Sequence, residues 1–489
     1  MNTPGQQLPR VIGYTTATAI VVGTVIGSGV FKKASVVSAD VPEIGLALLA
    51  WVLVGVLTLL GALTLAEVAV IVGKVGGNYA ILRDAYGRWA GFLWGWVEFW
   101  IIRSASIAAL ATIFTESLHD ILRHAHPDGP DIEVWGLWQR AGVTAAVIAV
   151  LGLVNARGTR LGGGLQVVVT TVKVASLVAI AVLPFVVAGF SDSPRATPQA
   201  SRLTPFWPTD WGQVSWQAFG GALVGVFWAY HGWMNIAPIA EEVKNPQRNI
   251  PLALLTGVGI IIALYLSANL AYYLIIPGPE IAALKNRTVA GEFSYRVLGS
   301  VGLVVASAAV MISVFGSLNG NLLVGPRLLY AMGQDGLAPR SLAQLHRRYQ
   351  TPARAGIALT AWSVLMVLVV AYLTGDSPPV LTIGGQTLEV SLPKKDPFDT
   401  ITNFAMFGAI SFETLAVASI FVFRRRFPKG DVALPYRCPA YPVLPAVYVL
   451  ALAAVLVNMF RAQPHEAMTG VTFVLVGALV YLLFGRKRA

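Results

Sequence analysis

Residues 20–31 read Ile20-Val21-Val22-Gly23-Thr24-Val25-Ile26-Gly27-Ser28-Gly29-Val30-Phe31. The stretch is apolar enough for a membrane helix, but it places three glycines within seven residues. Glycine is the worst helix former after proline, so the helix is predicted to break near Gly27. In hydrocarbon a broken helix leaves N–H and C=O groups without partners, which is tolerated only where they line a buried site. The stretch therefore predicts a binding site inside a membrane protein.

A second apolar stretch has the same character. Residues 220–233 read Gly220-Gly221-Ala222-Leu223-Val224-Gly225-Val226-Phe227-Trp228-Ala229-Tyr230-His231-Gly232-Trp233 and lie five expected spans later. Such glycines can also serve close helix packing. Interrupted helices at corresponding positions of two halves, however, are the sequence signature of an inverted-repeat transporter, and the paired placement favours that interpretation.

The composition agrees with a polytopic membrane protein. Of 489 residues, 56% are hydrophobic and 12% are charged, about half the charge of an ordinary soluble domain. About 20 apolar residues form one helical span. Twelve such stretches are expected, centred near Val22, Val56, Ile107, Val147, Val178, Gly225, Ile262, Ser313, Leu365, Ile410, Val449 and Leu475. No cleavable signal peptide is evident.

The net charge of +11 could indicate a nucleic-acid partner, but the positions of the basic residues indicate topology instead. With the N-terminus in the cytosol and twelve spans, 20 of the 35 Lys and Arg residues fall in inside segments and 9 in outside loops. This is the positive-inside bias. It predicts a multi-pass protein of the cell (inner) membrane with both termini cytosolic, whose basic excess faces anionic lipid and not nucleic acid.

Enzyme chemistry has no support in the residue inventory. The chain lacks a P-loop, H-E-x-x-H and G-x-S-x-G. Its one cysteine, Cys438, permits neither an intrachain disulfide nor a cysteine-based metal site. We expect no catalytic residue, no metal and no cofactor.

Several motifs resemble one family. Gly23 to Phe31 resembles the G-x-x-I-G-S-G-[IV]-F signature of amino acid–polyamine–organocation (APC) transporters. Glu241-Glu242 followed by Asn245-Pro246-Gln247-Arg248-Asn249-Ile250-Pro251 is similar to the family's exit from span 6. Further motifs narrow the resemblance to the prokaryotic L-type amino-acid transporter (LAT) branch: Leu65-Ala66-Glu67, Gly76-Gly77-Asn78-Tyr79, Trp96 to Arg103, Asn319-Gly320 and Leu434-Pro435-Tyr436-Arg437.

The resemblance implies an all-α membrane fold with a leucine-transporter-like 5+5 inverted repeat, discontinuous spans 1 and 6, and two peripheral helices. The boundaries that follow are a cytosolic tail at 1–11, the first repeat at 12–190, the second repeat at 191–426, peripheral spans at 427–485 and a cytosolic tail at 486–489.

Three departures from the family pattern stand out. Animal L-type transporters carry an outside-loop cysteine that binds a glycoprotein heavy chain, and the loop from His119 to Gly136 has none, so no disulfide-linked heavy chain is expected. Trp228 stands where phenylalanine is frequent, and His231 where a small residue is frequent.

The two broken helices supply the chemistry that an amino acid needs. Amide N–H groups at Gly27, Ser28 and Gly29 open a half-helix whose positive dipole end suits a carboxylate. Main-chain carbonyls suit the ammonium. The expected substrate-binding residues are Val22, Gly23, Thr24, Ile26, Gly27, Ser28, Gly29, Phe227, Trp228, Tyr230, His231 and Asn319. For Asn319 an interhelical hydrogen bond is an equally good interpretation.

Two side chains receive specific roles. Trp228 is expected to close over the substrate as a gate, against the alternative of a packing or interface tryptophan. Lys173 lies in the middle of span 5, where an unpaired charge would cost about 2.5–3.5 kcal/mol, so it is a functional candidate. By resemblance its ammonium takes the place of a sodium ion and holds span 1 to span 5.

Other intramembrane charges are interpreted as structural. Glu98 and Arg103 are five residues apart, one beyond ideal α-helical pairing, and Glu413 could face the pocket. The function expected is sodium-independent exchange or uptake of neutral L-amino acids. The alternative is a proton-coupled importer of cationic amino acids or polyamines.

Overall fold

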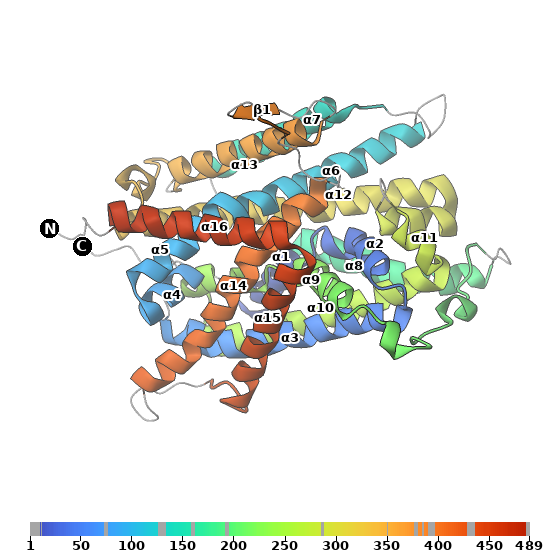
Figure 1. Ribbon diagram of the computed structural model, residues 1–489, viewed down its shortest axis with the longest axis horizontal. Helices are drawn as coiled ribbons and strands as arrows, with labels where there is room; N and C mark the ends of the chain where they lie inside the picture. Colours follow the sequence, from blue (N-terminus) through green and yellow to red (C-terminus); the bar gives the residue numbers. More distant parts are fainter. Residues whose placement is uncertain are drawn as a thin grey trace.

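The computed structural model describes residues 10, 12–72, 77–125, 134–157, 162–190, 195–284, 288–349, 351–375, 380–383, 386–389, 397–427 and 436–485. Nearly all of these residues lie in helices (Figure 1). The expected tails at 1–11 and 486–489 lie outside the described residues, apart from Arg10.

The label η marks short 3-10 or π-helical segments. The first half contains α1 (Tyr14–Val25), α2 (Gly29–Asp40), α3 (Ile44–Val72), α4 (Asn78–Tyr86), α5 (Arg88–Val97), η1 (Glu98–Arg103), α6 (Ser104–Ala125), α7 (Leu137–Ala156) and α8 (Gly162–Ala188). The second half contains η2 (Ala200–Leu203), η3 (Trp211–Gln213), α9 (Trp216–Tyr230), η4 (Trp233–Glu242), α10 (Pro246–Ile275), α11 (Gly278–Ala282), α12 (Val289–Gln334), η5 (Arg340–Ala343), α13 (Ala353–Thr374), β1 (Val380–Ile383), β2 (Gln386–Glu389) and α14 (Pro397–Arg426). The last elements are α15 (Val443–Ala462), α16 (Pro464–Val480) and η6 (Tyr481–Gly485).

The β-hairpin was not expected from the sequence. β1 and β2 pair antiparallel, with Val380 opposite Glu389 and Ile383 opposite Gln386. The hairpin lies in the connection between α13 and α14, outside the helical body that forms the site.

The membrane character of the chain is confirmed. In the described part, ten helices are long and apolar enough to cross a bilayer, or eleven if the bent pair α1 and α2 counts as one span. The remaining expected span corresponds to α9, whose 15 residues end at Tyr230 and are followed by η4. The protein is therefore a multi-pass membrane protein.

Helices far apart in sequence pack in pairs. α6 packs against α12, α7 against α13, and α3 against α10. The broken elements lie together, because α2 contacts α9 and α1 contacts η4. Figure 1 shows α6, α12, α13 and α16 running in roughly one direction, with α14 and α15 oblique to them and α1, α2, α8, α9 and α10 toward the middle.

The outer surface of the helical body is strongly apolar. Val150, Val301 and Leu450 expose 60%, 72% and 70% of their side chains. A soluble protein rarely exposes so many large apolar groups, so these faces suit contact with lipid chains. Inside the body, Arg424 and buried Glu67 form an ion pair: Arg424 donates to both carboxylate oxygens, at 2.8 and 2.7 Å.

Candidate functional site

The first helix breaks where the glycines predict. α1 ends at Val25, residues 26–28 are not helical, and α2 begins at Gly29 with a bend of 41°. The amide of Ile26 still donates to the Val22 carbonyl (2.9 Å), so the Val22 carbonyl is occupied by a helical hydrogen bond. The next carbonyl, that of Gly23, accepts a hydrogen bond from the side chain of Lys173.

The second break follows Tyr230. His231 is extended, Gly232 has φ 111°, and η4 begins at Trp233. Only glycine adopts that φ without strain. A Cβ on Gly232 would also lie 2.8 Å from the carbonyl oxygen of Thr24, whose hydroxyl donates to the Gly232 carbonyl at 3.1 Å. The two breaks therefore touch one another.

Two further contacts fix the breaks side by side. A Cβ on Gly29 would lie 2.4 Å from the Cα of Ala229, so α2 approaches α9 at main-chain distance. From α10, the buried hydroxyl of Tyr265 lies 3.2 Å from the carbonyl oxygen of Val25 and 3.0 Å from that of Ala229. One phenol thus faces the last carbonyls of both broken helices.

Lys173 reaches the first break from α8. Its ammonium donates to the carbonyls of Gly23 and Ile26, both at 2.7 Å, and to the hydroxyl of Ser317 on α12 at 2.6 Å. The side chain is fully buried. A buried ammonium is stable only when its three donors are satisfied, and these three acceptors satisfy them. Lys173 therefore joins α8, the break in the first helix and α12.

Trp228 lies between the two breaks. Its indole N–H points to the Ser28 hydroxyl at 3.4 Å, and its ring stacks on that of His231, with centroids 6.4 Å apart and planes 14° apart. The side chain is 8% exposed. The aromatic ring thus contacts one residue of each break, Ser28 and His231.

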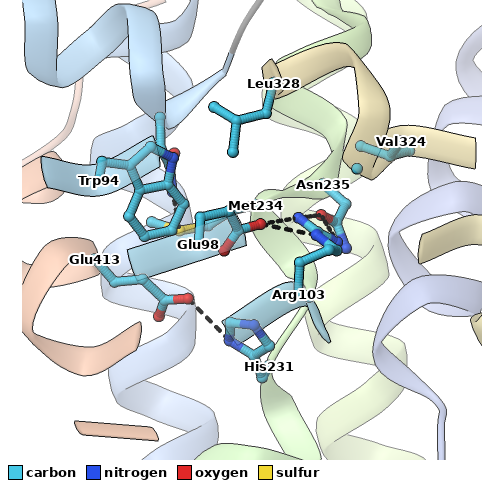
Figure 2. A pocket seen from close by; sticks show the side chains of 12 residues that line it. Trp94, Glu98, Arg103, His231, Met234, Asn235, Val324, Leu328 and Glu413 are labelled. Atoms are coloured by element: carbon cyan, nitrogen blue, oxygen red, sulfur yellow. Dashed lines mark hydrogen bonds and ion pairs between the residues drawn. The ribbon is translucent and has the colours of Figure 1, made fainter. Parts of the chain in front are cut away.

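A cavity of about 40 Å³ opens beside the second break (Figure 2). By volume it has room for a few water molecules. It is bordered by α4, α5, η1, η4, α12 and α14 and is lined by Asn78, Trp94, Glu98, Arg103, His231, Gly232, Met234, Asn235, Val324, Gly325, Leu328 and Glu413.

The charges in this cavity form two pairs. Nδ1 of His231 lies 2.9 Å from Oε1 of Glu413, an ion contact rather than an aligned hydrogen bond. Arg103 forms an ion pair with Glu98. Figure 2 shows the two pairs near one another among the side chains that line the cavity.

The Glu98–Arg103 pair depends on an unusual helical segment. η1 is a π-helix, whose i→i+5 geometry places residues five apart on one face. In an α-helix, side chains pair at a spacing of three or four residues, so Glu98 and Arg103 would be one residue too far apart. Arg103 also donates to Asn321 on α12 (2.6 Å) and faces Asn235 on η4 (3.3 Å), so it connects η1, α12 and η4 beside the second break.

The structure brings most of the expected site residues to the junction of the two breaks, but not Asn319. The Asn319 amide oxygen accepts from Asn155 on α7 (2.8 Å), which is the interhelical alternative. Sequence reasoning did not identify Tyr265 or Ser317. The sequence does offer a signal for Ser317: it follows Ser313 by one helical turn, so both lie on one face of α12. In the structure both hydroxyls lie near the Ile26 carbonyl.

Comparison with known proteins agrees with this geometry. Residues 12–484 match the family model described as amino acid permease. The serine/threonine exchanger SteT of Bacillus subtilis is 28% identical over 491 residues, covering all of both chains. The human b(0,+)-type amino acid transporter 1 and the human cystine/glutamate transporter are each 28% identical, covering 98% of this chain and 88% and 87% of theirs.

These relatives are transporters and not enzymes, and several belong to the L-type branch that the motifs resemble. The family resemblance inferred from the sequence is confirmed. The chain belongs to the amino acid permease family of the APC superfamily.

Proposed function

We propose that this protein is a sodium-independent secondary transporter that exchanges or takes up neutral L-amino acids by alternating access. The observation that carries the proposal is the junction of two broken helices, held by the Lys173 ammonium on the carbonyls of Gly23 and Ile26. The proposal also draws on relatives whose names describe amino-acid exchange and transport.

The junction offers complementary groups for a zwitterion. The start of α2, with the amides of Gly27, Ser28 and Gly29, suits the substrate carboxylate. The carbonyls at the end of α9 suit the ammonium. Trp228, which lies over this junction, is assigned the gate. The substrate-binding set is otherwise the one expected from the sequence, with the occupied Val22 carbonyl and Asn319 as its weakest members.

Lys173 supports sodium independence. Two carbonyls and a hydroxyl around one positive charge form the oxygen cage that would suit a monovalent cation, and the ammonium fills it. A sodium ion at this place would meet a fixed charge of the same sign. We therefore assign Lys173 the structural role of the coupling ion.

The packing pairs support a 5+5 repeat of twelve spans. Taking α1–α2 as span 1 and α9–η4 as span 6, spans 3 and 8 pack together, as do 4 and 9, and 2 and 7. Span 1 packs against span 7, and in the same way span 6 packs against span 2. Span 5 packs against span 8, and in the same way span 10 packs against span 3. These pairs of contacting spans stay the same when each of spans 1 to 5 is exchanged with the span five later. The repeats would occupy 12–190 and 191–426, followed by peripheral helices at 427–485.

The remaining assignments concern the surroundings. The distribution of Lys and Arg supports cytosolic termini in the cell (inner) membrane. The partners proposed are amino-acid substrates and the lipid bilayer, without nucleic acid. Cys438, the single cysteine, is buried, so a disulfide-linked heavy chain is not part of the proposal.

The alternative substrate class is cationic amino acids or polyamines. Such ligands favour an acidic pocket with an unpaired carboxylate. Both carboxylates of the cavity, Glu98 and Glu413, already face a basic partner. This pairing favours neutral amino acids.

The test is a transport assay on the purified protein in proteoliposomes. We expect saturable uptake of a radiolabelled neutral amino acid, stimulated by unlabelled substrate on the opposite side. A competition panel of the amino acids then defines the substrate. Exchange of sodium for choline should leave the rate unchanged. Flux that neither saturates nor shows trans-stimulation would indicate a channel and contradict the proposal.

A further inference from the structure

His231 belongs to the proposed substrate-binding set, but its buried contact with Glu413 has no part in binding the substrate. We propose that this pair is a proton-binding site, and that its charge state controls whether the end of α9 is held against α14, so that transport depends on pH. The inference rests on the proposed transport function and names a regulation of the same site.

The geometry of the pair is that of a latch between two elements. His231 immediately follows α9 in the second break, and Glu413 lies in the middle of α14. Their Nδ1 and Oε1 atoms are 2.9 Å apart, with side chains 21% and 7% exposed. The contact is an ion pair only while the imidazole is protonated and the carboxylate is ionised. A carboxylate this deeply buried is stable only with such a partner.

Loss or gain of one proton breaks the pair. If the imidazolium releases its proton to water, a buried carboxylate remains beside a neutral ring. If the carboxylate takes up a proton, a carboxylic acid remains beside an imidazolium. Either change removes the ionic attraction between the end of α9 and α14 and weakens their contact. Histidine is the side chain whose ordinary titration falls between pH 5 and 8, so the first change is accessible under physiological conditions.

The other charges near the pair are already accounted for. Glu98 and Arg103 of η1 also line the cavity and form an ion pair with each other. The neighbouring elements contribute neutral groups. Among the residues described, these are the phenol of Tyr448 on α15, which lies near Glu413, and the amides of Asn78 and Asn235, which line the cavity. Asn321 on α12 accepts a hydrogen bond from Arg103.

Two features connect the pair to transport. Both side chains line the cavity, which has room for water that can accept or supply the proton. The imidazole ring stacks on the indole of Trp228, and the next residue, Gly232, contacts Thr24 in the first break. A change in the position of His231 would therefore act on the gate and on the junction at once.

The experiment measures the initial rate of exchange of a labelled neutral amino acid in proteoliposomes from about pH 5.5 to 8.5, with equal pH on both sides. We expect the native rate to change by about threefold or more across this range. His231→Gln and Glu413→Gln should each flatten the profile, and the double variant should match the single ones. His465→Gln, at an exposed histidine of α16, should retain the native profile.

The outcomes separate the inference from the transport function. Absence of saturable exchange in the native protein contradicts the transport function itself. If the native protein exchanges substrate normally but its rate does not vary with pH, only the proton site is overturned. The same holds if both glutamine variants keep the native pH profile.

If both glutamine variants are inactive, Glu413→Asp decides the question. This variant keeps a carboxylate but draws it back by one methylene. A shifted pH profile would support the latch, and an unchanged profile would overturn it.

Discussion

At the scale of single residues, the site depends on side chains that satisfy main-chain groups left over by the broken helices. Lys173, Tyr265 and Thr24 all bind carbonyls at the ends of α1 or α9, or in the breaks that follow. A carbonyl without a partner is costly away from water, so these contacts stabilise a conformation that the helices alone would not hold. Trp228 differs from them, because it binds a side chain, the hydroxyl of Ser28.

This difference leads to a prediction for the gate. Trp228→Ala should lower the maximal rate of exchange by roughly tenfold or more with a smaller change in KM, because loss of the cap affects closure more than first binding. Trp228→Phe should retain much of the rate, because an aromatic ring still covers the junction. The measurement is the concentration dependence of exchange in proteoliposomes.

The control for Trp228 is Trp138→Ala, at a tryptophan of α7 that is 56% exposed, which should behave like the native protein. Near-normal and equal rates in Trp228→Ala and Trp228→Phe would show that Trp228 is a packing residue and that the gate lies elsewhere.

Lys173 gives the second prediction. Lys173→Met keeps most of the side-chain volume but leaves the carbonyls of Gly23 and Ile26 without their donor, so exchange should fall by roughly tenfold or more while the protein still inserts. Lys173→Ala should be at least as damaging. Uptake by the native protein should be the same in sodium and in choline. A steep sodium dependence, or ample transport by both variants, would refute the coupling-ion role.

The sequence predicted the main chain of the site better than its side chains. Glycines mark both breaks, and a lysine in mid-membrane is conspicuous. Tyr265 was missed because a tyrosine in a membrane helix is common, and only the fold shows that it faces two carbonyls. Asn319 was ambiguous because a polar residue on a helix can serve a ligand or a neighbouring helix with equal chemistry.

At the scale of elements, close packing of α2 on α9 is what brings the two breaks into contact. Gly29→Ala should weaken it, because the added Cβ would lie 2.4 Å from the Cα of Ala229, where neither main chain can yield easily. Overpacking of this kind costs about 1–3 kcal/mol. We expect a lower melting temperature in detergent and reduced exchange.

The matched control is Gly142→Ala in α7, where an added Cβ meets nothing within 4 Å. It should leave exchange unchanged and not lower the melting temperature, since alanine is the better helix former. Equal melting temperatures and rates in Gly29→Ala and the native protein would show that α2 and α9 adjust freely.

The π-helical η1 shows what sequence patterns cannot supply at this scale. The five-residue spacing of Glu98 and Arg103 looked unfavourable because an α-helix was assumed. The extra residue in the turn is stabilised by tertiary contacts of Arg103 with Asn321 and Asn235, which lie more than a hundred residues away in the chain. Local propensity contains no information about such partners.

At the scale of the whole molecule, the sequence predicted a helical membrane body well, because hydrocarbon allows so few structures. The family followed from short motifs. The hairpin β1–β2 was missed because it lies in a connection where no such constraint acts. Which distant helices pack together, such as α6 with α12 and α7 with α13, could be seen only in the fold.

The proposed inverted repeat would look similar from both sides of the membrane, so the distribution of charges must decide the orientation. With 20 Lys and Arg residues in the expected inside segments and 9 in the outside loops, both termini should be cytosolic. A cysteine at position 489 (Ala489→Cys) should therefore resist a membrane-impermeant maleimide in intact cells and react after permeabilisation. Thr209→Cys, exposed in an expected outside loop, should react in intact cells.

The native Cys438 adds little background to this experiment. It is 4% exposed, and burial raises the pKa of its thiol, so little of the reactive thiolate forms at neutral pH. Labelling of the two introduced cysteines therefore reports their own positions. Efficient labelling of Ala489→Cys in intact cells, with protection of Thr209→Cys, would invert the molecule in the membrane. Every assignment of the proposed gate and proton site to one side of the membrane would then be reversed.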